Sequence, residues 1–126
     1  MKVRYVLPCL LVALYSTLAP AAADVWWSCD YSSFRGDGKD QGYFHVIGDQ
    51  LEEASGDVIL DFKLLEDSEK AIVAAKGGSY ASGPAIMGFL VMINKKTGEF
   101  ILTTSSTGSV NGRQTGNCVR VDHRPW

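Results

Sequence analysis

The chain has 126 residues, of which 46% are hydrophobic, enough for one domain with one core. Its 12 basic and 14 acidic residues give a formal net charge of −2. This balance argues against binding to nucleic acid or to an anionic membrane surface, because both depend on clustered positive charge.

Residues 1–23 are typical of a secretory signal peptide. Two basic residues precede an apolar stretch, and Ala21 and Ala23 occupy the small-residue positions that a signal peptidase requires. The stretch is shorter than the roughly 20 residues that span a bilayer. We therefore expect cleavage after Ala23, a single β domain over residues 24–126 with no membrane span, and a periplasmic or secreted location.

Removal of the leader leaves two cysteines, Cys29 and Cys118, near the two ends of the domain. In an oxidising compartment such a pair normally forms a disulfide. A bond that encloses most of the domain would stabilise it by about 4 to 5 kcal/mol on the chain-entropy model. A redox role would require a C-x-x-C motif, which the sequence lacks, so the predicted bond is structural.

The domain begins with a predicted strand. In VWWSCDY, residues 25–31, apolar residues alternate with others so that Trp27 and Cys29 share an inward face. Trp26 then points to the opposite face. It either packs beneath a terminal segment or the segment 103–117, or it is an exposed contact residue.

Period-two alternation continues through the middle of the chain. Residues 43–47 and 50–54 are predicted to pair across a two-residue turn that contains Gly48. The next strand, 58–65, has the clearest alternation in the sequence. Residues 71–75 fit either a strand or part of a helix, and we favour a strand.

The last third of the chain is predicted to contain a hairpin and a closing strand. Residues 86–94 are apolar on both faces, as expected of a central strand that is buried on both sides. A turn with Gly98 in the left-handed conformation connects this strand to 99–105. The polar segment 103–117 is predicted to be a long loop that leads into a short strand carrying Cys118.

These elements predict an all-β domain. Seven or eight short strands, with turns every eight to twelve residues, favour a small antiparallel barrel or a sandwich. The disulfide then ties the first strand to the last.

The sequence contains no pattern of catalytic or metal-ligating residues. The two histidines, His45 and His123, are not spaced for a metal site, and no G-x-S-x-G motif occurs. The glycine-rich segment 36–42 lacks the ligand pattern of a calcium loop and the G-x-x-x-x-G-K of a phosphate loop. We therefore expect no catalytic residue, no metal and no cofactor.

Four short motifs are spread over the domain: W-x-C after the leader, F-x-V-x-G-D-x-L, N-K-x-T-G-x-F, and a closing G-x-C. They begin at Trp27, Phe44, Asn94 and Gly116. In this pattern the chain resembles a group of small exported proteins of Gram-negative bacteria whose function is unknown. The resemblance implies a shared fold and no catalytic residue.

A looser likeness concerns residues 76–83. Tyr80 precedes Ser82 and Gly83, and a K-G dipeptide lies upstream at Lys76 and Gly77. The segment is similar to the S-G-x-x-Y loop and K-G dipeptide of the periplasmic lysozyme inhibitors of the small β-barrel type, although the order of the residues is reversed. The resemblance implies an alternative function, inhibition of a cell-wall-degrading enzyme.

From these observations we expect an exported, non-enzymatic β domain. It would bind a small ligand or a protein partner of the cell envelope through the segments 76–85 and 103–117. The candidate contact residues are Trp26, Tyr80, Ser82, Asn111 and Arg113.

Overall fold

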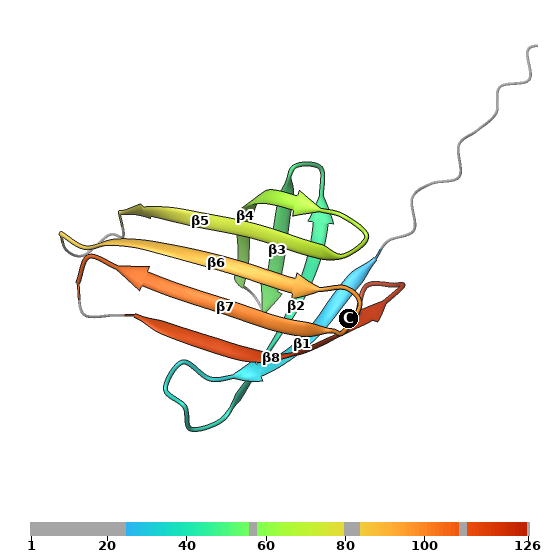
Figure 1. The fold of residues 1–126 in the computed structure, drawn as a ribbon, viewed down its shortest axis with the longest axis horizontal. Helices are drawn as coiled ribbons and strands as arrows, with labels where there is room; N and C mark the ends of the chain where they lie inside the picture. Colours follow the sequence, from blue (N-terminus) through green and yellow to red (C-terminus); the bar gives the residue numbers. More distant parts are fainter. Residues whose placement is uncertain (1–24, 56–57, 80–83, 109–110, 126) are drawn as a thin grey trace, which may run out of the picture.

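The computed structural model describes residues 25–55, 58–79, 84–108 and 111–125, and the predicted leader lies outside this part of the chain (Figure 1). The described residues form a closed antiparallel barrel of eight strands with no helix. Each strand pairs with its neighbours in sequence, and the last pairs with the first. The strands are β1 (Trp26–Ser32), β2 (Lys39–Ile47), β3 (Gln50–Ser55), β4 (Val58–Asp67), β5 (Ala71–Ser79), β6 (Ile86–Asn94), β7 (Glu99–Ser106) and β8 (Gly112–Val121).

The core fills the middle of the barrel. Alternate residues of every strand point inward because successive side chains of a strand lie on opposite faces. Phe44, Leu51, Ile72, Ile93 and Phe100 are among the largest side chains that are completely buried there. The period-two pattern of the sequence therefore identified the inner face correctly.

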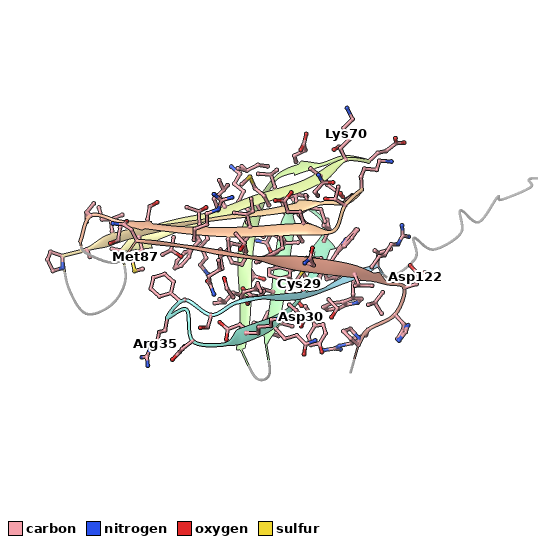
Figure 2. The ribbon with its side chains drawn as sticks, turned by 60° about the horizontal axis from the view of Figure 1, so that its bottom comes forward. Cys29, Asp30, Arg35, Lys70, Met87 and Asp122 are labelled. Carbon is pink, nitrogen blue, oxygen red and sulfur yellow. A yellow bond between two sulfur atoms is a disulfide. The ribbon has the colours of Figure 1, made fainter. Side chains whose placement is uncertain are left out.

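The barrel closes between β1 and β8 through a disulfide. Cys29 and Cys118 are directly opposite each other in the register of the two strands, and their sulfur atoms are bonded. Figure 2 shows Cys29 near the middle of the barrel, with Arg35 and Met87 at one end and Lys70 and Asp122 at the other. The predicted disulfide is confirmed, and it ties the first strand to the last.

The predicted turns and strands are also largely confirmed. The β2–β3 turn contains Gly48 and the β6–β7 turn contains Gly98, and both glycines have positive φ angles. Residues 71–79 form a strand, as favoured, and β6 spans the predicted residues 86–94. Residues 55–57, between the predicted strands 50–54 and 58–65, fall partly outside the described part of the chain.

One prediction about β6 is wrong. Its outward residues are not covered by a second layer: Leu90 and Met92 are only half-buried, and Ile86 is 56% exposed. The reason is that a single sheet closed on itself buries only its inner face. Every second residue of the apolar stretch in β6 therefore lies on the outer surface of the barrel.

The predicted loop over 103–117 is also wrong. β7 continues to Ser106 and β8 begins at Gly112, so most of this polar segment is a pair of hydrogen-bonded strands. Thr104 and Gln114 lie on the inner face and are buried. Similarly, the predicted contact segment 76–85 begins inside β5. The polar composition misled the prediction because the barrel interior is itself polar at this end.

Candidate ligand-binding cavity

The interior of the barrel changes from apolar to polar toward the end that carries Arg35 and Met87, which we call the cavity end (Figure 2). The register places polar residues of six strands on the inner face there. They are Tyr31 of β1, Asp40 of β2, Glu53 of β3, Lys76 of β5, Thr104 of β7 and Gln114 of β8.

A cavity of about 300 Å³ lies at this end. Its walls combine aromatic and aliphatic side chains with a few polar groups that converge from different strands. The lining residues are Tyr31, Phe34, Asp40, Glu53, Leu60, Phe62, Lys76, Phe89, Leu102 and Gln114. Such a mixture is typical of sites for small molecules.

Glu53 is the most deeply placed acidic group of the cavity. Its residue is only 8% exposed, and its Oε1 accepts a hydrogen bond from the Tyr31 hydroxyl at 3.2 Å. Burial raises the pKa of Glu53 above its ordinary value, and the negative charge of Asp40 raises it further, whereas the hydrogen bond from Tyr31 acts in the opposite direction. Burial and the nearby carboxylate of Glu53 also raise the pKa of Tyr31.

On the side of the cavity formed by β8, the Gln114 side chain is held in place by hydrogen bonds. Its Nε2 donates a hydrogen bond of 2.9 Å to the backbone carbonyl of Ser32 and a longer one of 3.4 Å to Oδ2 of Asp40. Because the amide nitrogen has partners on β1 and β2, the side chain is held against these strands. Its orientation also positions the Asp40 carboxylate beside the cavity.

Phe34, in the connection between β1 and β2, covers part of the cavity end. Its ring packs directly over Gly112 at the start of β8, where a Cβ atom would collide with the ring. The side chain is half-exposed and also lines the cavity. Phe34 therefore forms one wall of the entrance.

The barrel wall is incomplete between β4 and β5 at the same end. These strands pair only from Lys63 with Ala75 to Asp67 with Ile72. Residues 58–62 of β4 pair with β3 alone, so the two strands separate toward the cavity end.

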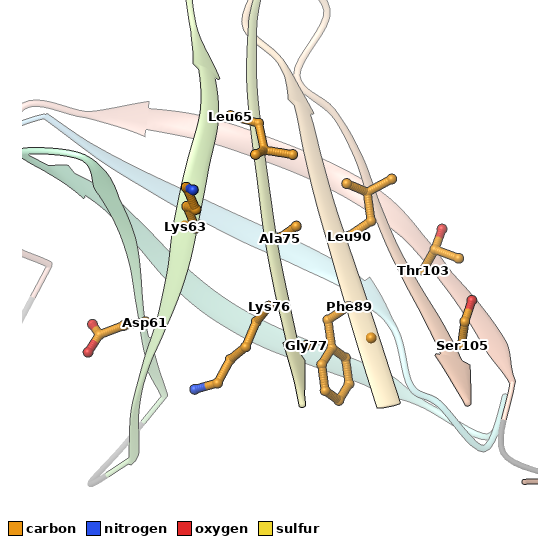
Figure 3. A pocket seen from close by; sticks show the side chains of 11 residues that line it. Asp61, Lys63, Leu65, Ala75, Lys76, Gly77, Phe89, Leu90, Thr103 and Ser105 are labelled. Carbon is orange, nitrogen blue, oxygen red and sulfur yellow. The ribbon is translucent and has the colours of Figure 1, made fainter. Parts of the chain in front are cut away.

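Lys76 of β5 and Phe89, its paired residue on β6, lie on the β5 side of this gap. Both line the interior cavity, and both line a larger groove of about 700 Å³ on the outside of β4–β7. Figure 3 shows the Lys76 side chain extending from β5 toward the part of β4 that carries Asp61. The gap therefore connects the region of the cavity with the outer surface.

A different set of residues fills the opposite end of the barrel. Trp27 lies in the core there, and Lys95 forms an ion pair with Asp67 across the β4–β5 and β6–β7 turns. Trp26 is only 4% exposed and stacks on the ring of His45, with 4.3 Å between ring centroids. Trp26 is therefore not exposed in this structure, and one of the residues that it contacts is His45 of the adjoining strand β2.

Two of the other four predicted contact residues, Asn111 and Arg113, lie in the described part of the chain, and neither lines the cavity. Tyr80 and Ser82 lie outside the described residues. Asn111 accepts a hydrogen bond from the backbone nitrogen of Ser106 at its Oδ1. Arg113 is exposed on the outer face of β8.

Sequence reasoning missed the polar residues inside the barrel. Glu53 shares the inward face of Leu51, two residues away, and Gln114 shares that of Cys118. The sequence signal that could have identified these residues is a charged or amide side chain at the same alternating strand positions as the core residues. Lys76 belongs to the K-G dipeptide of the looser resemblance, but its side chain lines the barrel cavity.

Within the described ranges, no group of three or more histidine, cysteine or acidic residues is arranged to hold a metal ion. The same part of the chain has no helix with the length and apolar character needed to cross a membrane. Comparisons with models of protein families, with curated proteins and with solved structures found no match for this chain.

Proposed function

We propose that the protein is an exported, non-enzymatic barrel that binds a small, partly apolar ligand in the cavity beside Glu53. The observation that carries the proposal is the cavity itself, which combines apolar walls with buried polar groups from several strands. Ligand sites in proteins have this composition, because apolar walls supply affinity and a few polar groups fix orientation.

The free-energy cost of burying polar groups in the cavity supports a role in binding. An acidic side chain inside a small barrel destabilises the fold unless its hydrogen-bonding capacity is satisfied. Tyr31 provides one hydrogen bond to Glu53, and no other side-chain hydrogen bond of Glu53 occurs among the described residues. A leucine at this position would extend the core, so the buried carboxyl is best explained by a bound partner.

The size and position of the cavity restrict the ligand. A volume of about 300 Å³ is at the lower end of the range for small-molecule sites, which favours a compact molecule. The gap between β4 and β5, bordered by Lys76 and Phe89, offers a route of access in addition to the end covered by Phe34. Binding would thus occur inside the barrel and not through the loop segments inferred from the sequence.

The proposed location in the periplasm or outside the cell rests on two observations. The leader pattern over residues 1–23 is that of an exported protein. The buried disulfide between Cys29 and Cys118 is compatible with an oxidising compartment.

The proposal is tested by filling the cavity. Leu60 lines the cavity from β4, whereas its neighbour Ile59 is exposed and does not line it. A thermal-shift screen of the exported protein with small cationic, neutral and anionic compounds should yield stabilising ligands. Leu60→Trp should abolish the shift, and the matched control Ile59→Trp should retain it. Equal shifts in both variants would place binding outside the cavity, and a screen without any stabilising compound would reject the function.

A further inference from the structure

We infer that the ligand of this cavity is an organic cation. Its amine lies beside the carboxylates of Glu53 and Asp40, and its apolar part packs against the aromatic walls. This inference rests on the binding function proposed above and specifies the chemical class of the ligand.

The polar groups of the cavity are predominantly hydrogen-bond acceptors. The Tyr31 hydroxyl donates to Glu53, and the Gln114 amide nitrogen donates to Ser32 and Asp40. These donors are therefore already used within the protein. Glu53 retains the oxygen that Tyr31 does not contact, and Gln114 retains its amide oxygen. A ligand that brings donors fits this arrangement better than one that brings acceptors.

Among the residues that the structure describes, the two carboxylates have no cationic partner. Glu53 and Asp40 line the same cavity, and neither forms an ion pair with any described residue. Glu53 is buried whereas Asp40 is exposed, and two negative groups that line one cavity repel each other. A cation placed between them removes the repulsion. An ammonium group supplies this charge together with up to three hydrogen-bond donors.

The apolar walls fit the rest of such a ligand. Tyr31, Phe34, Phe62 and Phe89 present four aromatic rings to the cavity. Aromatic faces attract cations as well as apolar groups, since the ring face carries partial negative charge. Carboxylates together with aromatic rings therefore favour an amine with an apolar body over a neutral molecule of the same size.

Lys76 is the one lysine or arginine that lines the cavity in the described part of the chain. It lies at the gap between β4 and β5 and also lines the outer groove. Figure 3 shows its side chain directed toward the part of β4 that carries Asp61. An anionic ligand could contact Lys76 only in a cavity that also contains two carboxylates. The test therefore includes an anion of the same size as the amine probe.

The experiment compares three probes that share a phenyl ring and a short chain: phenethylamine, phenethyl alcohol and phenylacetate. Their affinities for the exported protein are measured by isothermal titration calorimetry. We expect phenethylamine to bind at least tenfold more tightly than the alcohol, and phenylacetate to bind most weakly. Glu53→Gln should weaken phenethylamine binding about tenfold and leave binding of the alcohol unchanged within about twofold.

The matched control is Glu52→Gln, because Glu52 is the neighbouring carboxylate on β3 and does not line the cavity. It should leave all three affinities unchanged. Asp40→Asn, at an exposed position, serves as a second variant if Glu53→Gln does not fold, and it should also weaken only amine binding.

Two results would overturn the inference and leave the binding function intact. The first is an alcohol or carboxylate that binds as tightly as the amine. The second is an amine affinity that neither Glu53→Gln nor Asp40→Asn reduces. Absence of binding by all three probes also rejects an amine ligand of this size, and the Leu60 and Ile59 variants then decide the binding function separately.

Discussion

Substitution of Gly98 by valine tests the β6–β7 turn and its contact with β8. Gly98 has a φ of 79°, where a side chain with a Cβ atom is strained. A Cβ at this position would lie 2.6 Å from the carbonyl oxygen of Cys118, well inside an ordinary contact distance. Gly98 also accepts a hydrogen bond from the Cys118 nitrogen. The substitution therefore strains both the turn and the closing strand.

The expected loss of stability has two parts. The left-handed conformation costs about 1 to 2 kcal/mol for a residue other than glycine, and more for a β-branched one. Relief of the clash requires β8 to move away, which weakens a backbone hydrogen bond worth about 1 kcal/mol. We expect Gly98→Val to lower the free energy of unfolding by about 3 kcal/mol, a large part of the roughly 5 to 15 kcal/mol typical of a domain.

Two further glycines separate these contributions. Gly48 has a φ of 58°, but no neighbouring atom lies within 4 Å of the position that a Cβ atom would occupy, so Gly48→Val should show the conformational cost alone. At Gly108 the nearest atoms are 3.7 Å from the corresponding position and the φ angle is not positive, so Gly108→Val should change stability by less than about 0.5 kcal/mol.

The assay is urea denaturation of the oxidised protein, followed by tryptophan fluorescence and circular dichroism. The expected order of destabilisation is Gly98→Val, then Gly48→Val, then Gly108→Val. Equal destabilisation by the Gly98 and Gly48 substitutions would show that the contact with Cys118 contributes nothing. Equal effects at Gly98 and Gly108 would refute the turn assignment itself.

The fold and the cavity lead to three other predictions. The intact mass of the exported protein should correspond to a chain that begins at Asp24 and is about two mass units lighter than its reduced form. Simultaneous replacement of Cys29 and Cys118 by alanine should lower the free energy of unfolding by about 4 kcal/mol in denaturation experiments, because the bond joins residues 89 positions apart; an unchanged stability would contradict this. Burial raises the pKa of Glu53 above 4.5, so the folded protein holds this proton more tightly than the unfolded chain, and stability should fall as pH rises above about 4.5 through the folded pKa. In urea titrations at several pH values, Glu53→Gln should lack this fall and Glu52→Gln should retain it.

The alternation of residues was sufficient to predict the fold class. A strand with one face toward a core tends to carry an apolar side chain at every second residue, and VWWSCDY and VILDFKLL follow this pattern. The two glycine turns are likewise recognisable from short stretches of sequence. The pairing of Cys29 with Cys118 was also predictable, since these are the two cysteines outside the predicted leader. These features depend on short stretches of sequence or on simple elimination.

The cavity depended on tertiary structure. Closure of the sheet brings Tyr31, Asp40, Glu53 and Gln114 from four strands around one space, although they are distant in sequence. The same closure converts the polar segment 103–117 into two strands and leaves the outer face of β6 partly exposed. Local patterns cannot specify this arrangement, because which residues face one another across the interior is set by the register of the paired strands around the whole barrel, including β1 with β8. The disulfide that joins these two strands fixes the closure.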